Sequence, residues 1–413
     1  MLGKGWLLAG LSLLSSLSFA KVQITSLSPC DQQGSAVQPQ LGDEFYLRAE
    51  LSSNLLTSDT ASLYFTAPSG NRWTPKESVN GNLSLVWGPF RCLADMPMNI
   101  DVKVVETGAV QHLTVMPVEP ISAVEKYAPQ AVSASFWASW SGQLGTGKWV
   151  IPVPSDGPFQ QMDAVEVPGF ATPAAVGGQQ VAVWTGGTTA SVNTSYTGFS
   201  ARVNSGLLRH ISFAQLDSGS PQMQAWLGSE SYLPVANATF GSLVSSSLGS
   251  NYRATKTPFE AAQALYQLTI KKLAYTATAY APDAVAALKR GKGDCASFAS
   301  VFVTLCRRAG IPARPALGFI EGTNKWHVWA EFWLPNVGWI PVDPAYADGL
   351  RPAGDVPLYF GVIPDLNKRL VTSYGYDRVV DGTTIKQLQS PALLGVDPRN
   401  GTWTSGCTLS AAN

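Results

Sequence analysis

Residues 291–349 constrain the fold more than any other part of the chain, because they encode a bounded helix followed by a hairpin. Asp294 precedes apolar residues at helical spacing and is therefore the predicted N-cap, and Gly310 fits the position just past the last turn. Cys295 then lies in the first turn, where unpaired amides and the positive end of the helix dipole favour a thiolate. The neighbouring carboxylate opposes this unless the capping amides take up its charge, so a further stabilising group is expected.

A histidine in the following segment can supply that group. The chain has three histidines, and His327 lies in the run K-W-H-V-W-A-E-F-W, whose aromatic and β-branched residues are typical of a strand. The run W-I-P-V-D-P then predicts the return strand of an antiparallel hairpin. If the turn centres on Pro335, His327 stands opposite Asp343 on one face, with Cβ atoms roughly 5 Å apart. Asp343 can then orient the imidazole while the other ring nitrogen meets the Cys295 thiol.

Four segments in this order, G-D-C-A-S-F-A, G-I-P-A-R-P-A-L-G-F, W-H-V-W-A-E-F-W and G-W-I-P-V-D-P, resemble the core of the transglutaminase-like superfamily over about residues 230–350. The resemblance implies a papain-like α+β core, in which a helix carrying the nucleophile packs on an antiparallel sheet. By motif position it implies Cys295 as the nucleophile, His327 as general base and acid, and Asp343 as the residue that orients the histidine. Tyr275 lies where many bacterial members carry an aromatic residue, and we assign it no catalytic role.

Two further helices are predicted upstream of the cysteine. Thr257, Pro258 and Glu260 form a capping box with proline at the first helical position, ahead of an apolar stripe. A short helix over residues 282–290 should end at Gly291 and deliver the chain to the cysteine turn.

The remaining chain is expected to be mainly β, so the fold class is a multidomain protein with N-terminal β-sandwich-like regions before the α+β core. Alternating runs such as A-S-L-Y-F-T-A and N-I-D-V-K-V-V-E, broken by Gly, Pro and Asn, indicate short strands. The expected division is a signal peptide over 1–20, a β-sandwich-like domain over 21–125, a second β-rich domain over 126–229, the catalytic domain over 230–386 and a C-terminal arm over 387–413.

Composition and the N-terminus indicate an exported protein. The formal net charge is zero and 14% of the residues are charged, so neither a nucleic-acid footprint nor a polybasic membrane patch is present. Lys4 precedes an apolar stretch over residues 6–17, and Ser18-Phe19-Ala20 fits a signal-peptidase site. We expect cleavage after Ala20, a secreted or periplasmic location, and no stable membrane insertion of the mature chain.

The five cysteines divide into structural and reactive groups. Cys30 and Cys92 flank a β-patterned region and are the expected disulfide pair. Cys306 lies roughly 16 Å from Cys295 along one helix and is expected to fill the core, with a bond to Cys407 as the alternative. The sequence shows no Cys-x-x-Cys pair, no clustered histidines and no calcium-loop pattern, so no metal or cofactor is predicted. The other two histidines, His112 and His210, are expected to be structural.

Two classes of function follow from these patterns. The favoured one is an exported thiol enzyme whose Cys295 attacks an amide or peptide carbonyl of a protein or peptide substrate, forms a thioester and passes the acyl group to water or an amine, with the acceptor left open. Transfer to water, as in a cysteine peptidase or amidase, is the alternative within the enzyme class. The other class is a surface binding protein that keeps the fold without catalysis, with the β regions making the contacts.

Overall fold

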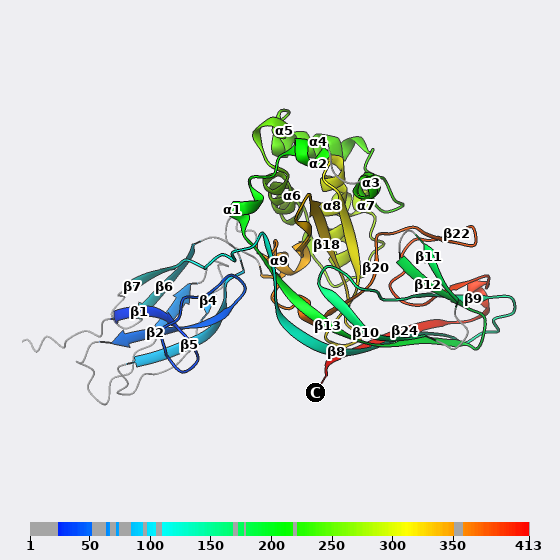
Figure 1. Ribbon diagram of the computed structural model, residues 1–413, viewed down its shortest axis with the longest axis horizontal. Helices are drawn as coiled ribbons and strands as arrows, with labels where there is room; N and C mark the ends of the chain where they lie inside the picture. Colours follow the sequence, from blue (N-terminus) through cyan, green and yellow to red (C-terminus); the bar gives the residue numbers. More distant parts are fainter. Residues whose placement is uncertain are drawn as a thin grey trace, which may run out of the picture.

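The structure is a computed structural model that describes residues 24–51, 63–66, 72–73, 84–93, 97–104, 110–167, 172–176, 179–217, 221–350 and 358–412. The expected signal peptide lies outside the described residues. Figure 1 shows an N-terminal lobe of strands in blue, a group of helices in green and yellow, and a second β region in which the last strand lies beside an early one. None of the helices within the described ranges is long and apolar enough to span a membrane.

The N-terminal lobe consists of two sheets that share one core. The sheet order β1-β2-β5 joins Ile24–Cys30, Glu44–Leu51 and Ser84–Arg91, and the order β4-β3-β6-β7 joins Arg72–Trp73, Leu63–Thr66, Met98–Val104 and Val110–Val115. Side chains from both sheets, including Phe45, Leu47, Ile100 and Val102, are buried together. The alternation of buried and exposed residues along β2 explains why this segment forms a strand with one face in the core.

The expected disulfide between Cys30 and Cys92 is not formed, and this prediction was wrong. All five cysteines are free thiols. Cys30 ends β1 and Cys92 follows β5, and β2 lies between these two strands. Two strand spacings correspond to roughly 10 Å, which exceeds the Cα separation of about 4.4–6.8 Å that a disulfide requires. Both thiols are buried instead, and burial raises the pKa of each, to about 12 for Cys92.

The second β region combines strands that are far apart in the sequence. Its larger sheet has the order β10-β13-β8-β24-β17, with bounds Gln160–Glu166, Thr189–Val203, Val124–Trp140, Trp403–Ala411 and Gly322–Thr323. Its smaller sheet has the order β11-β12-β9-β23, with bounds Thr172–Val176, Gln179–Trp184, Lys148–Pro152 and Ala392–Leu394. The large apolar side chains Phe136, Trp149 and Tyr196 are buried between them. The hairpin of β21 (Arg378–Val380) and β22 (Thr383–Ile385) packs beside the smaller sheet.

The chain after residue 387 is not the arm that the sequence suggested. It supplies β23 to the smaller sheet and β24 to the larger one, where β24 pairs with β8 from Trp403 to Ala411. Cys407 of β24 faces this core and Cys306 is buried in the core around the helices, so the two thiols occupy different cores and are not bonded.

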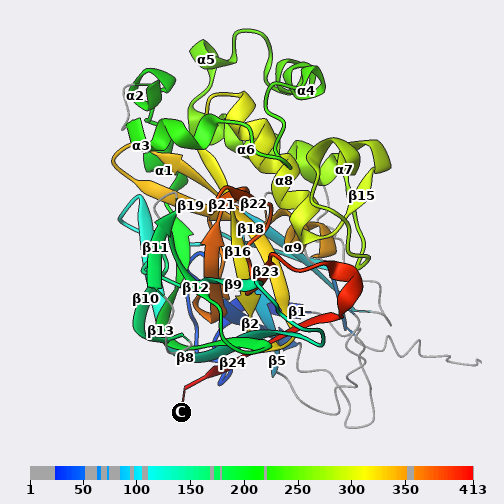
Figure 2. The same ribbon diagram turned by 90° about the vertical axis from the view of Figure 1, so that its right-hand side faces the viewer.

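The helices gather on one side of a third sheet, as Figure 2 shows. This sheet has the order β19-β18-β16-β20, with bounds Gly338–Val342, Trp326–Leu334, Ala313–Ile320 and Arg369–Tyr374. The principal helices are α4 (Ala238–Leu248), α6 (Pro258–Lys272), α7 (Ala284–Arg290), α8 (Cys295–Arg308) and α9 (Pro344–Leu350). Shorter helices are α1 (Ser205–Leu208), α2 (Phe213–Asp217), α3 (Pro221–Gln224), α5 (Tyr252–Thr255), η1 (Ala225–Leu227), η2 (Leu366–Lys368) and η3 (Pro398–Asn400).

Local sequence signals account for the helices that position the site. The capping box of α6 is present in both directions between Thr257 and Glu260. Gly291 ends α7 in the left-handed conformation that glycine adopts most readily, and the two-residue strands β14 (Ala274–Tyr275) and β15 (Lys292–Gly293) pair just before α8. α8 packs against β16 and β18, and Phe302 of this helix contacts Phe332 of β18. The helix start is thereby fixed beside one end of the sheet.

Candidate active site

Cys295 is the first residue of α8 and is partly exposed. Asp294 caps the helix, since its Oδ1 accepts hydrogen bonds from the Ser297 amide at 3.0 Å and the Ser297 hydroxyl at 2.9 Å. Its Oδ2 accepts a third bond, from the amide of Tyr280, at 3.2 Å. These three donors take up the negative charge beside the thiol. Cys295 therefore lies at the positive end of the helix dipole, beside a carboxylate that is already hydrogen-bonded.

His327 and Asp343 meet in a register that differs from the predicted one. Leu334 pairs with Gly338 and Ala330 with Val342, so the hairpin turns around Asn336 and not Pro335. The shift places Asp343, just beyond the end of β19, two residues from the position opposite His327. A shift of two residues keeps both side chains on one face of the hairpin. The two side chains therefore still meet, diagonally across the hairpin, and His327 Nε2 lies 2.7 Å from Asp343 Oδ2.

The ring of His327 contacts both of its predicted partners. Its Nε2 is bonded to Asp343, and the Cys295 thiol is near enough to raise the pKa of the ring. Nδ1 is therefore the nitrogen available to the sulfur. Tyr346 packs edge-on against the ring with centroids 5.0 Å apart, and Trp329 stacks on it at 6.1 Å. The structure thus brings the three predicted residues together from α8, β18 and the end of β19.

Arg369 is a member of this cluster that the sequence analysis missed. Its Nη1 donates to Asp343 Oδ2 at 2.6 Å, and its Nη2 lies 3.1 Å from both carboxylate oxygens of Asp365. The Asp343 Oδ1 accepts the Tyr346 amide at 3.1 Å, so both carboxylate oxygens are bonded. The hydroxyl of Tyr266, from α6, also donates to the Asp343 carbonyl at 3.0 Å. The only sequence sign of Arg369 is an arginine that opens an apolar, strand-like run.

The charges in this buried cluster favour ionised forms of both members of the hairpin pair. Burial acts to lower the pKa of His327, but Asp343 and Cys295 outweigh it and raise the pKa from 6.5 to about 9. Burial acts to raise the pKa of Asp343, but His327 and Arg369 outweigh it and lower the pKa to about 2. An imidazolium held between a carboxylate and a sulfur is the arrangement that supports a nucleophilic thiolate.

Tyr275 lies beside the cysteine turn. It pairs with Gly293 across β14 and β15, its amide donates to Asp348 at 2.7 Å, and its ring is 6.4 Å from that of Phe298. Burial, followed by the negative charges of Cys295 and Asp294, raises the pKa of its phenol. The phenol therefore stays protonated at neutral pH and remains a hydrogen-bond donor near the sulfur.

The aromatic residues of the hairpin and the other two histidines differ in their surroundings. Of the tryptophans on the hairpin, Trp329 is buried beneath His327 and Trp326 packs on Phe319 in the second β region. His112 is an exposed residue of β7 that pairs with Asp101, and His210 is exposed after α1. Among the described residues, no group of His, Cys, Asp and Glu side chains is arranged to hold a metal ion.

The chain carries the core of a known family. Residues 247–344 match the family model of the Transglutaminase-like superfamily. They form a transglutaminase-like core. Cys295, His327 and Asp343 all fall inside the matched residues, whereas Arg369, which bonds to Asp343, and its second partner Asp365 fall outside them.

Two curated relatives match parts of this core. A protein-glutamine gamma-glutamyltransferase of Pseudomonas aeruginosa is 36% identical over 66 residues, which are 13% of this chain and 10% of that protein. An uncharacterized protein of Haemophilus influenzae is 37% identical over 84 residues, which are 14% of this chain and 23% of that protein. The chain therefore spans less than a quarter of the length of these relatives.

A solved structure resembles a large part of the chain. The crystal structure of a proposed cysteine protease from Cytophaga hutchinsonii aligns with a TM-score of 0.52 at 13% sequence identity. The alignment covers 70% of this chain and 93% of that one. At this identity the likeness shows a shared fold.

Proposed function

We propose that the protein is an exported thiol acyl-transfer enzyme that acts on amide or peptide carbonyls through a thioester on Cys295. The observation that carries the proposal is that one imidazole, that of His327, is bonded to Asp343 and has its pKa raised by the nearby Cys295 thiol. Covalent acyl transfer requires a nucleophile beside a base, and a carboxylate that orients the base. The transglutaminase-like core provides independent support for a cysteine enzyme.

The first half of the reaction forms the thioester. The Cys295 thiolate attacks the carbonyl carbon, a C–S bond forms, and the carbonyl oxygen becomes an oxyanion. Amides at the start of α8 that Asp294 does not cap are donors that can stabilise this oxyanion. The C–N bond then breaks, and the His327 imidazolium gives its proton to the departing nitrogen.

The second half returns the thiol and decides the product. His327, now neutral, takes a proton from the incoming amine or water as that group attacks the thioester carbon, and the sulfur leaves. An amine acceptor gives a new amide. The Pseudomonas aeruginosa relative is named as such a transferase, a protein-glutamine gamma-glutamyltransferase. A water acceptor gives a carboxylic acid, the outcome for a peptidase or amidase, which the name of the Cytophaga hutchinsonii protein favours as the alternative.

The test is mass spectrometry of a glutamine-containing peptide library after incubation with the protein and a primary amine. Amine transfer gives products in which the amine has replaced ammonia, and hydrolysis gives products in which water has replaced the released nitrogen group. Cys295→Ala should abolish either product, whereas Cys306→Ala, a change in a buried thiol on the same helix, should retain it. Unchanged peptides with the wild-type protein, together with no labelling of Cys295 by an electrophile, would instead support a non-catalytic binding protein.

Export forms part of the proposal and rests on the N-terminal sequence. Lys4, the apolar stretch after it and the small residues before Lys21 fit a cleavable signal peptide. The mature protein recovered outside the cytoplasm should begin at Lys21, as N-terminal sequencing would show. Recovery of the full-length chain from the cytoplasm alone would contradict this part.

A further inference from the structure

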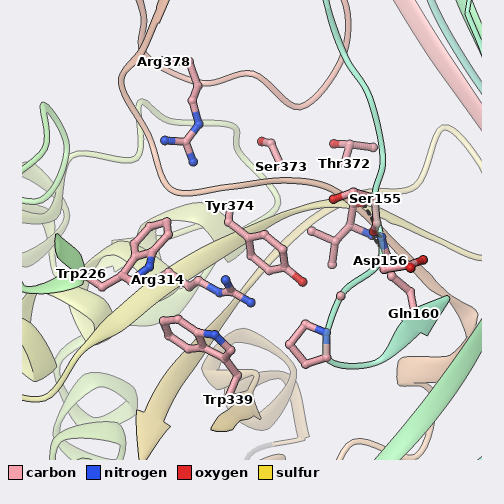
Figure 3. Close-up of a pocket in the computed structure, with 13 residues that line it drawn as sticks. Ser155, Asp156, Gln160, Trp226, Arg314, Trp339, Thr372, Ser373, Tyr374 and Arg378 are labelled. Atoms are coloured by element: carbon pink, nitrogen blue, oxygen red, sulfur yellow. Dashed lines mark hydrogen bonds between the residues drawn. The ribbon is translucent and has the colours of Figure 1, made fainter. Parts of the chain in front are cut away.

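A second candidate site lies between the loop after β9 and the edge of the core sheet. A cavity of about 270 Å³ is lined there by aromatic rings, two guanidinium groups and a serine hydroxyl. Figure 3 shows Trp226, Trp339, Tyr374, Arg314, Arg378 and Ser373 around it. Neither Cys295, His327 nor Asp343 is among the lining residues. The pocket is therefore distinct from the candidate active site.

Arg378 is the feature of this pocket that requires a ligand. The residue is 9% exposed, and its Nε is a buried donor without a hydrogen-bond partner among the described residues. Glu230 is the acidic group that acts on it most strongly, but that carboxylate is already paired with Arg307 at 2.7 Å. Burial lowers the pKa of Arg378, as expected for a cation removed from water without a bound anion. A buried donor without a partner is costly to folding unless a ligand or water satisfies it.

Arg314 provides a second, rigidly held guanidinium. It lies between the rings of Trp339 and Tyr374, at 3.8 Å and 3.4 Å from their centroids. Its Nε and Nη2 donate to one oxygen of Glu331, at 2.9 Å and 2.7 Å. Its Nη1 is used by neither bond. The group is thus fixed in place before any ligand arrives, which reduces the entropy lost on binding.

The remaining lining groups indicate what kind of anion fits. Ser373 Oγ is a further buried hydroxyl without a hydrogen-bond partner among the described residues. Asp156 also lines the cavity, and its Oδ1 accepts the Met162 amide at 2.8 Å. The Asp156 carboxylate disfavours a doubly charged phosphate in the cavity. The Trp226 and Trp339 rings favour an apolar group beside the bound anion.

We propose that this pocket binds the carboxylate of an organic acid or a polypeptide, with Arg378 as the main donor, Arg314 as the second, and the tryptophan rings against the adjoining apolar group. Arginine suits this task because its planar fork matches the two oxygens of a carboxylate. Binding of a carboxylate in this pocket does not depend on catalysis by Cys295.

The test is a titration of the full chain with N-acetylphenylalanine and with its amide, followed by calorimetry and tryptophan fluorescence. The acid should bind and the amide should bind at least about tenfold more weakly, as expected for the loss of one charge-assisted hydrogen bond. Arg378→Gln should weaken acid binding by a similar factor, and Arg378→Lys should recover part of it. Arg399→Gln, at an exposed arginine paired with Asp397, is the matched control and should bind like the wild type.

Two further arms decide the source and the class of the anion. A peptide ending in a phenylalanine carboxylate, compared with its amidated form, shows whether a polypeptide end binds better than the free acid. Inorganic phosphate serves as the competing anion. Equal binding of acid and amide, full acid affinity in folded Arg378→Gln, or tighter binding of phosphate than of the acid would each overturn the proposal. If Arg378→Gln fails to fold, the comparison of acid with amide and the Arg378→Lys variant still give the answer.

Discussion

The buried His327 should make the stability of the protein fall as the pH rises through the alkaline range. Its pKa is 6.5 in an unfolded chain and about 9 in the folded protein, so the folded state holds the proton more tightly. The resulting stabilisation is fully present below about pH 6.5 and is lost as the pH rises through about 9. The difference between the two pKa values corresponds to roughly 3 kcal/mol of unfolding free energy. His327→Gln removes this contribution and leaves other titrating groups in place.

Urea unfolding of both proteins from about pH 6 to about pH 10, followed by tryptophan fluorescence, measures the effect. The difference in unfolding free energy between wild type and His327→Gln should shrink by about 3 kcal/mol over this range. His112→Gln is the control, because His112 is an exposed histidine whose side chain is 75% accessible. Its curve should run parallel to that of the wild type. Parallel curves for His327→Gln as well would refute the reasoning, because His327 would then hold no excess proton in the folded state.

Three further predictions concern the same cluster. Iodoacetamide should modify Cys295 faster than Cys306 at mildly acidic pH, because burial raises the pKa of the Cys306 thiol well above its usual range; equal modification in the folded protein would contradict the assignment. Asp343→Asn should lower turnover by ~10²-fold or more and leave substrate binding near normal, since the wrong imidazole tautomer is favoured; full activity would rule out the orienting role. Arg369→Met should lower the unfolding free energy by about 3–5 kcal/mol, because it leaves the buried Asp343 with one cation fewer; a loss in urea titrations below about 1 kcal/mol would show that the pair is not coupled as described.

The local parts of the site were predictable because short-range chemistry determines them. Asp294 and Gly310 bound α8 as expected, and the capping box between Thr257 and Glu260 starts α6. Caps, helix periods and positive-φ glycines act within four or five residues. A single sequence therefore contains all the information that these features need.

The hairpin register shows the limit of that reasoning. Its strands and its shared face followed from the sequence, but the turn centres on Asn336, which has a positive φ, and not on Pro335. Asparagine tolerates a positive φ better than most residues do. The preference of Asn336 for this conformation was therefore the sequence signal that would have located the turn. Because the error was two residues, the face carrying His327 and Asp343 was preserved.

Long-range contacts were not predictable from the sequence alone. Arg369 reaches Asp343 only because β20 joins the edge of the core sheet beside β16. The Cys30–Cys92 pairing failed for a similar reason, since linear flanking does not reveal that β2 lies between the two cysteines. Each of these contacts depends on strand order, which an isolated sequence without related sequences does not specify.

The pairing of β24 with β8 makes the transglutaminase-like core an insertion within a β-sheet. Ser139 of β8 bonds to Thr404 of β24, 265 residues later in the chain, and the whole helical core lies between them. At a synthesis rate of about 5–20 residues per second, β24 is made roughly 13–53 s after β8, the strand with which it pairs. Throughout that interval its open edge can pair with other chains. The transglutaminase-like core is thus anchored at both ends by one sheet, and that sheet closes only after Cys295, His327 and Asp343 have been made.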